Sequence, residues 1–267
     1  MNQEQTAFRT KSLIWAWTIF VIAIIYLPVL CSALASLTKS RYFLFPVKKW
    51  SFDWWDKTMA SIEVSTLVKT SLMLAGSVTV LATLIGFFGA LAFARYEWKG
   101  RSFFQKIVLL PIFFPQPVLG LALLLWFNAL GMPLSWHTAV IAHLVWIAPV
   151  VTLVIAIQVY GFDPVVEEAA FDLGASRFQV MKEVTLPMLW PGIWSGMLFA
   201  FLLSWGNFPL SLYTAGADST VPKWLFTKMI SGYTPMVPTL GTMSTLAAAV
   251  VLSIGGLAMI IARRRAD

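Results

Sequence analysis

Charged residues are scarce in this chain. Asp, Glu, Lys and Arg together make up 12% of its 267 residues, whereas 59% are hydrophobic. A soluble globular domain carries about a quarter charged residues. The low charge, with a mean hydropathy of +0.79, therefore indicates that lipid is the solvent for most of the chain.

Cysteine and histidine are scarcer still. The single cysteine, Cys31, lies inside an apolar run, which excludes a disulfide framework. His137 and His143 are the only histidines and have no acidic neighbours at ligand spacing, so we expect no metal site. The sequence also lacks a nucleophile–base arrangement and a Gly-x-x-x-x-Gly-Lys phosphate loop. We therefore expect no enzymatic activity and no cofactor on this chain.

The net charge of +7 does not indicate a nucleic-acid surface. The lysines and arginines lie between apolar runs and at the chain ends, rather than on one soluble face. This is the pattern of topology signals in a membrane protein. We therefore expect membrane lipid around the chain and no nucleic-acid partner.

Six runs are apolar and long enough to cross a bilayer, which takes about 20 mostly apolar residues in a helix. None of them contains Asp, Glu, Lys or Arg. The first run is too long for a signal-peptide core and lacks a small-residue cleavage site, so we expect it to be retained. The sequence thus predicts an all-α integral membrane protein with six transmembrane helices. They are Leu13–Leu34, Ser71–Ala94, Ile107–Phe127, Ala139–Tyr160, Gly192–Tyr213 and Thr242–Ala262.

Short basic segments predict the orientation. Basic residues precede the first run and follow the last, and four more lie between the second and third runs. The link 128–138 has no Lys or Arg. Because Lys and Arg concentrate on the cytoplasmic side, we expect residues 1–12 and 263–267 to be cytoplasmic and residues 35–70 to form an outer loop.

Prolines interrupt the third run at Pro111, Pro115 and Pro117. Each removes a backbone donor. Such breaks persist in lipid only where neighbouring helices or a water-lined path satisfy the freed carbonyls. Two interpretations follow: a helix that faces a translocation route, or a kink that serves packing.

The link between the fourth and fifth runs is rich in helix signals. Asp163 is a candidate N-cap, followed by Pro164 at the first helical position. Gly174 suits the left-handed residue that ends a helix, and Ser176 can cap a second helix. We expect Pro187 to keep this second helix from running on into the fifth span.

The two predicted helices of this link are made mostly of small and apolar residues, and together they carry four acidic and two basic residues. A helical knob with an apolar face outside the membrane needs a surface on which to bury that face. This favours docking on a cytoplasmic protein. The alternative is an amphipathic helix that lies on lipid, which the excess of acids and the lack of bulky side chains disfavour.

The spacing within residues 161–187 is specific. Glu168-Ala169-Ala170 is followed after three residues by Gly174, and after nine more by Val184-Thr185-Leu186-Pro187. This resembles the EAA loop of binding-protein-dependent ABC permeases. The resemblance implies a coupling helix that docks into a groove on a separate ATP-binding subunit. The implied coupling residues are Glu167, Glu168, Ala169, Ala170, Asp172, Leu173, Gly174, Ala175, Arg177, Val184, Leu186 and Pro187.

The resemblance extends over about residues 13–265. Leu84-Ile85-Gly86, Arg95-Tyr96, Pro115 and Gly120 look like the type I importer permeases of the spermidine/putrescine group, in particular their second permease subunit. This implies a type I (MetI-like) core of five spans, residues 71–262, preceded by the first span, residues 13–34.

The resemblance also implies an assembly in the bacterial inner membrane. Its parts are a second permease subunit, two ABC ATPase subunits that hold ATP and Mg, and an extracytoplasmic substrate-binding protein. This chain then forms half of a translocation pathway for a small solute. The rival function is an ion-coupled secondary transporter, for which the spans lack ionisable residues and the halves lack visible repeats.

The substrate stays open among polyamines, opines, phosphonates, thiamine and iron chelates, which permeases of this group serve. Where polyamine permeases carry acidic residues, this chain has Gly206 and Asn207, and no predicted span holds a carboxylate. A multivalent cation in a low-dielectric passage benefits from carboxylates, so polyamines become less favoured, although the partner permease can supply acids. For the aromatic members of the predicted path, core packing is the alternative role. The predicted path residues are Pro115, Gly120, Ser204, Trp205, Asn207 and Tyr213.

Overall fold

The computed structural model describes residues 3–266 of the chain. Within this range the backbone forms helices and one isolated β-bridge, between Thr38 and Trp50, and no strand. The chain divides into two compact units. One comprises Met1–Val64 with Thr227–Ala247, and the other Ser65–Phe226 with Ala248–Asp267.

The first unit carries the long helix α1 (Gln3–Ser36) and the loop after it. The most apolar stretch of α1 buries none of its residues within this chain, as expected of a helix surrounded by lipid or by another subunit. Trp55 of α2 (Asp53–Met59) donates from Nε1 to Ser36 Oγ at 3.3 Å, which ties the loop back to the end of α1.

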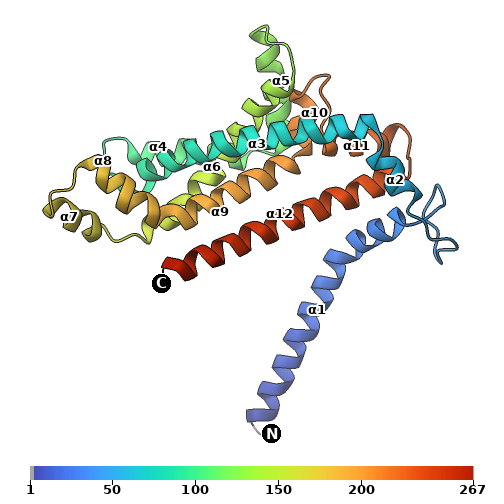
Figure 1. Ribbon diagram of the computed structural model, residues 1–267, viewed down its shortest axis with the longest axis horizontal. Coiled ribbons are helices and arrows are strands. Elements are labelled where there is room, and N and C mark those ends of the chain that lie inside the picture. Colours follow the sequence, from blue (N-terminus) through green and yellow to red (C-terminus); the bar gives the residue numbers. More distant parts are fainter. Residues whose placement is uncertain (1–2, 267) are drawn as a thin grey trace. The chain divides into compact units, whose positions relative to one another are not determined.

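The second unit is built around α6 (Trp136–Tyr160). Helix α9 (Leu186–Trp205) packs along α6, while α10 (Phe208–Thr214) contacts both α6 and α5 (Gln116–Ala129). Figure 1 shows α3 (Ile62–Ala90) lying along the same axis as α6 and α9, with α9 running in the opposite chain direction. The remaining elements are the π-helical turn η1 (Leu91–Arg95), α4 (Arg101–Leu109), the 3-10 turn η2 (Leu110–Phe113), α7 (Val165–Asp172), α8 (Arg177–Gln179), the π-helical turn η3 (Val180–Thr185), α11 (Val221–Ser231) and α12 (Met236–Ala266).

Glycines allow the helices of the second unit to approach closely. A Cβ on Gly86 of α3 would lie 2.6 Å from Val151 Cγ1 of α6, and one on Gly192 of α9 would lie 2.7 Å from Gln158 Cβ of α6. Because lipid tails are as apolar as the side chains, association of helices in a membrane depends on such van der Waals contact. These two glycines therefore set how near α3 and α9 come to α6.

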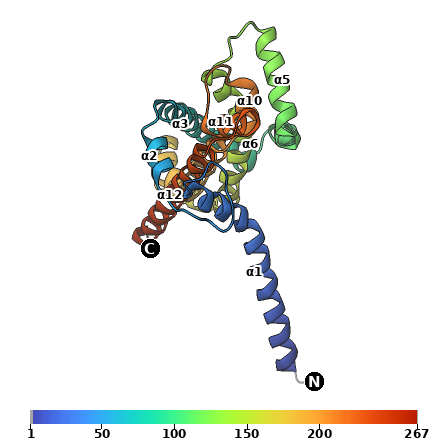
Figure 2. The ribbon, with the colours of Figure 1, turned by 90° about the vertical axis from the view of Figure 1, so that its right-hand side faces the viewer.

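Five helices of the described chain are long and apolar enough to cross a membrane, or six if a bent pair counts as one span. The bent pair, Arg101–Phe113 and Gln116–Ala129, covers the predicted third span, Ile107–Phe127, and bends where prolines interrupt that run. Its two parts meet at 102°, and Figures 1 and 2 both show α5 leaving the direction of α6. Phe114 is extended, with ψ of 134°, because the proline that follows it disfavours its helical conformation. Pro115 itself has ψ of 126° and is also outside the helical region.

The predicted fifth span, Gly192–Tyr213, is also not one helix. Helix α9 ends at Trp205, and after Gly206 the chain begins α10, with Asn207 Oδ1 accepting a hydrogen bond from the Leu210 N–H at 3.1 Å. The prediction was based on one continuous apolar run. Hydropathy cannot tell whether such a run forms one helix or two helices separated by a capped break.

The expectation that Pro187 stops the second loop helix is wrong as well. The chain is helical from Arg177 to Trp205. The π-helical turn η3 directly precedes α9, and its extra residue widens the helix just before the proline. This gives the pyrrolidine ring the space that it lacks behind a regular α-helical turn.

Polar residues extend several helices beyond the apolar runs. Helix α1 begins at Gln3 inside the predicted N-terminal tail, and α3 begins at Ile62 inside the predicted outer loop. Helix α12 begins at Met236 and continues to Ala266, within the predicted C-terminal tail. Hydropathy marks the part of a helix that suits lipid, whereas the backbone hydrogen bonds continue past it.

We expect Gly86→Ala to lower the melting temperature of the purified protein in detergent, because the added methyl group meets Val151 and the α6 backbone. Gly76→Ala on the same helix is the matched control, since nothing lies within 4 Å of a Cβ there. In that open position alanine stabilises a helix over glycine by roughly 0.5–1 kcal/mol. Thermal unfolding followed by tryptophan fluorescence compares the two variants, and equal melting temperatures would contradict the close approach.

Candidate functional site

The link between α6 and α9 folds into a helical knob, defined here as residues 163–187. It lies at one end of the second unit (Figure 1), where α7 and α8 both pack on η3. The N-cap of α7 is Pro164, one residue after the predicted Asp163. Asp163 Oδ1 still accepts a hydrogen bond from the Val165 N–H at 3.0 Å, at the first residue of the helix.

Gly174 ends α7 in the left-handed conformation, with φ +86°, as predicted. Its N–H donates to Phe171 O at 2.9 Å, and the Ala175 N–H donates to Ala170 O at 3.1 Å. This pair of hydrogen bonds is a Schellman motif, which satisfies carbonyls at the end of a helix. The sharp turn that separates α7 from α8 therefore depends on the backbone freedom of one glycine.

Ser176 begins α8 with a reciprocal cap. The Gln179 N–H donates to Ser176 Oγ at 3.3 Å, and the Ser176 N–H donates to Gln179 Oε1 at 2.8 Å. The predicted N-cap is confirmed, and Gln179 completes a capping box. Both short helices of the knob are thus closed by their own residues.

Glu167 faces the interior of the second unit. One carboxylate oxygen pairs with Arg95, the last residue of η1, and the other accepts a hydrogen bond from the hydroxyl of Thr185, the last residue of η3. The Glu167 side chain is only 16% exposed, and the Arg95 side chain 15%. The Arg95 guanidinium also lies over the ring of Phe162, 5.1 Å from its centroid. These contacts anchor α7 to the ends of two long helices.

Several large apolar side chains of the knob are exposed, on α7, at its C-cap and on α8. Leu173 is 89% exposed and Phe178 74%, and Val165 is 60% exposed. Glu168 and Ala169 are exposed beside them. Large apolar side chains that stand out together on well-capped helices indicate an interaction surface. We call these five residues the outer face.

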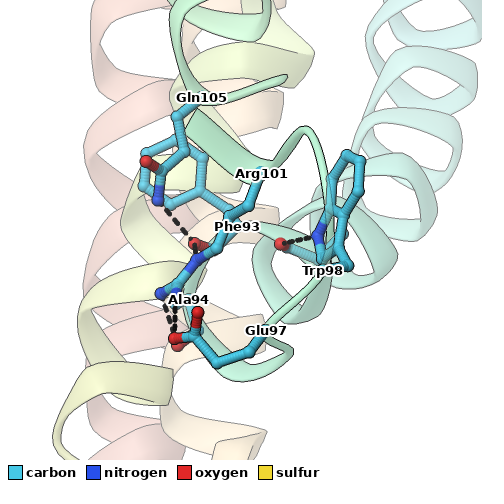
Figure 3. A network of polar contacts seen from close by, with 7 residues as sticks. Phe93, Ala94, Glu97, Trp98, Arg101 and Gln105 are labelled. Atoms are coloured by element: carbon cyan, nitrogen blue, oxygen red, sulfur yellow. Dashed lines mark hydrogen bonds and ion pairs between the residues drawn. The ribbon is translucent and has the colours of Figure 1, made fainter. Parts of the chain in front are cut away.

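Side chains of the next segment hold the end of the second span. Arg101 donates from Nε to Phe93 O at 3.1 Å and from Nη2 to Ala94 O at 3.3 Å, and Gln105 donates to Phe93 O at 2.8 Å (Figure 3). Trp98 donates to a neighbouring carbonyl. The last carbonyls of a helix have no partners within it, so this network caps η1 and fixes the start of α4 to it.

The predicted coupling residues divide by position. Glu167 and Ala170 turn toward the unit, and Val184 is half-buried in η3. Glu168, Ala169, Leu173 and Gly174 lie outside. The sequence did not separate Glu167 from Glu168, because adjacent residues on a helix differ by a rotation that only the packing of α7 assigns to inside or outside. Asp172, Arg177, Leu186 and Pro187 are exposed, and Ala175 is half-buried.

Of the predicted path residues, Ser204 and Asn207 are buried. Ser204 Oγ lies 2.9 Å from His143 Nδ1, and Ser211 Oγ lies 3.0 Å from His143 Nε2. This buried imidazole therefore joins α6, α9 and α10, a role that a lone histidine in an apolar run did not reveal. Asn207 caps α10.

Gly120 packs against Tyr213, since a Cβ at Gly120 would lie 2.9 Å from Tyr213 Cδ2. Trp205 is half-buried, and Pro115 is exposed at the bend before α5. These positions do not decide whether the residues line a path, which stays a prediction.

No group of three or more His, Cys, Asp and Glu residues within the described part of the chain is arranged to hold a metal ion. An apolar groove of about 340 Å³ lies between α3, α4 and α6, with Gly89, Pro111 and Thr152 in its lining. It has no charged side chain in its lining.

Over residues 82–267 the chain matches the family described as binding-protein-dependent transport system inner membrane component. The chain belongs to this family. This permease is 29% identical over 228 residues to the spermidine/putrescine transport system permease protein PotC of Haemophilus influenzae, across 85% of this chain and 88% of that protein.

Solved structures of ABC transporters share the fold of this permease. A chain of a bacterial alginate ABC transporter, in complex with an alginate pentasaccharide-bound periplasmic protein, matches 98% of this chain and 96% of its own length, with a TM-score of 0.73 and 16% identity. A chain of the MetNI methionine ABC transporter matches 76% of this permease and 99% of its own length, with a TM-score of 0.61 and 17% identity. The predicted family and the predicted all-α, MetI-like fold are confirmed.

We expect Gly174→Ala to destabilise the turn of the knob, because an L-residue in the left-handed region costs about 1–2 kcal/mol. Gly161→Ala is the matched control: its φ is −82°, and its Cβ would meet nothing closer than 3.7 Å. Limited proteolysis of the detergent-solubilised permease measures the effect. Faster cleavage between α7 and α8 is expected for Gly174→Ala alone, and equal rates for both variants would contradict the requirement.

Proposed function

We propose that this permease is one subunit of an ABC importer and that the outer face of the knob docks on a cytoplasmic ATP-hydrolysing subunit. The observation that carries the proposal is the outer face itself, an exposed apolar surface on capped helices within the EAA-like segment. A second permease subunit completes the pathway, of which this chain forms half. ATP and Mg bind to the ATP-hydrolysing subunits, of which the complex has two.

The position of the charges supports the orientation that this function needs. Arg95 and Arg101 lie at the end of α3–η1 and the start of α4, and the knob lies at the same end of the second unit (Figure 1). Because Lys and Arg concentrate on the cytoplasmic side, the knob faces the cytoplasm, as do both termini. The outer ends of the spans then receive a solute from an extracytoplasmic binding protein of the kind seen with the alginate transporter.

The solute is a small molecule that the binding protein selects. The similarity to a spermidine/putrescine permease supports a permease of the group that the sequence resembles, which serves polyamines, opines or phosphonates, without selecting among these solutes. None of the six apolar runs of this chain carries a carboxylate, which disfavours a multivalent cation unless the second permease subunit supplies the acids.

We expect Leu173→Glu and Phe178→Glu to abolish co-purification of the cognate ATPase subunit, because each places a charge at the centre of the apolar docking surface. Truncation of a central interface residue typically costs 2 kcal/mol or more, or roughly thirtyfold in affinity. Phe45→Glu is the control, since Phe45 is 84% exposed and lies in the predicted outer loop.

The measurement is the amount of ATPase subunit retained per tagged permease after affinity purification in detergent. Retention of the ATPase by both knob variants at the wild-type level would overturn the docking role. Uptake into vesicles that persists without ATP and collapses with a proton ionophore would instead support an ion-coupled transporter.

The substrate class is tested on the binding protein encoded with this permease. Each candidate solute is added to the purified binding protein, and its melting temperature is measured. A ligand present at 100 times its Kd stabilises the folded protein by about 2.7 kcal/mol. We expect a shift with a solute other than spermidine or putrescine, and a clear shift with either polyamine would contradict the argument from the missing carboxylates.

A further inference from the structure

Glu167 occupies a position that docking alone does not explain. Its two carboxylate oxygens bind separate elements: Oε2 pairs with Arg95, and Oε1 accepts the Thr185 hydroxyl hydrogen. Arg95 ends η1 and Thr185 ends η3, so one side chain of α7 joins the last residues of two π-helical turns. We call these three residues the clamp.

The clamp is shielded from any protein that docks on the knob. Thr185 is 2% exposed, and the side chains of Arg95 and Glu167 are 15% and 16% exposed. Phe162, itself 7% exposed, covers the guanidinium from the other side. A charge-assisted hydrogen bond in such a partly desolvated place is strong and directional. Glu168, one residue further along α7, is exposed and has no such enclosure.

The clamp reaches both membrane helices that flank the knob. Through Thr185 it holds the residue directly before α9, within the continuous helix Arg177–Trp205, and through Arg95 it holds the end of α3–η1. The carbonyls of Phe93 and Ala94, in the same turn as Arg95, are bonded by Arg101 at the start of α4 (Figure 3). A displacement of α7 therefore acts on α9 and, through η1, on α3 and α4 together.

Both long helices are π-helical where the clamp holds them. A π-helical turn inserts an extra residue into the helix, is rare, and occurs frequently at functional sites. Such a turn has a nearby alternative in the regular α-helical turn, which differs in rotation and length. Two such turns tied to one carboxylate can change together when that carboxylate moves.

From these contacts we infer that Glu167 is a positioning residue that transmits movement of α7 to α3, α4 and α9, while the outer face makes the docking contact. The inference rests on the proposed function, because it assigns the route by which the docked ATPase and the membrane helices influence one another. Loss of the clamp is then expected to leave docking of the ATPase intact while it weakens the transmission of movement to the membrane helices.

The test uses the complete transporter, with its cognate ATPase, in lipid nanodiscs. The binding protein is purified separately and added. Two quantities are measured: the ATPase retained per permease, and the factor by which the binding protein stimulates ATP hydrolysis. Glu167→Gln keeps the shape of the side chain and removes its charge. It is expected to retain the ATPase as the wild type does, while the stimulation falls by roughly fivefold or more, the range of coupling between distant sites.

Two matched variants separate the alternatives. Glu168→Gln removes the neighbouring charge from the outer face and is expected to lower ATPase retention. Glu183→Gln removes an exposed carboxylate of the knob outside the clamp and is expected to change neither quantity. Thr185→Val also lowers the stimulation, and adding it to Glu167→Gln has little further effect, because both changes break the same linkage.

Glu167→Gln with wild-type stimulation, or with ATPase retention reduced as in Glu168→Gln, overturns the inference. If Glu167→Gln does not accumulate in the membrane, Thr185→Val decides by the same two measurements, and wild-type stimulation in that variant overturns the inference. A wild-type permease that neither retains the ATPase nor responds to the binding protein refutes the proposed function instead.

Discussion

Lipid offers no hydrogen-bond partner, and the polar groups of this permease are arranged around that constraint. The backbone satisfies itself within helices. Among the buried side chains, Thr152 donates to the carbonyl four residues back, and His143 lies between two serine hydroxyls from other helices. The breaks that remain are closed by side chains, as Asn207 does at the start of α10. His143 therefore joins three helices, whereas Thr152 bonds within its own helix.

The helices of this permease must also pack closely. Lipid tails are as apolar as the side chains, so no hydrophobic effect drives the helices together and van der Waals contact has to hold them. Gly86 and Gly192 bring α3 and α9 against α6, where a methyl group has no room. The backbone accommodates its prolines in different ways. Pro115 follows an extended residue and turns the chain by 102°, whereas Pro187 stays within a helix because a π-helical turn precedes it.

The knob combines an internal anchor with an exposed apolar surface, spread over α7 and α8. Its inner side holds Glu167 against Arg95 and Thr185, so the helix is positioned by contacts that reach into the membrane helices. Its outer side leaves Leu173 and Phe178 exposed, which suits a surface that a partner covers. A rotation of about 100° per residue along a helix places two adjacent glutamates in these different environments.

Composition and hydropathy were enough to predict the membrane class, and the resemblance of residues 161–187 to a known loop predicted the family. The left-handed turn at Gly174 and the cap at Ser176 were predictable because each depends on a residue and its immediate neighbours. The tertiary structure alone decided the bend at Pro115, the break at Gly206 and the continuous helix through Pro187. It also decided that Glu167 is anchored while Glu168 is free to meet a partner, since Arg95 is far from both in the sequence. Local patterns encode local geometry, whereas the choice among kinks, breaks and buried pairs depends on which helix lies alongside.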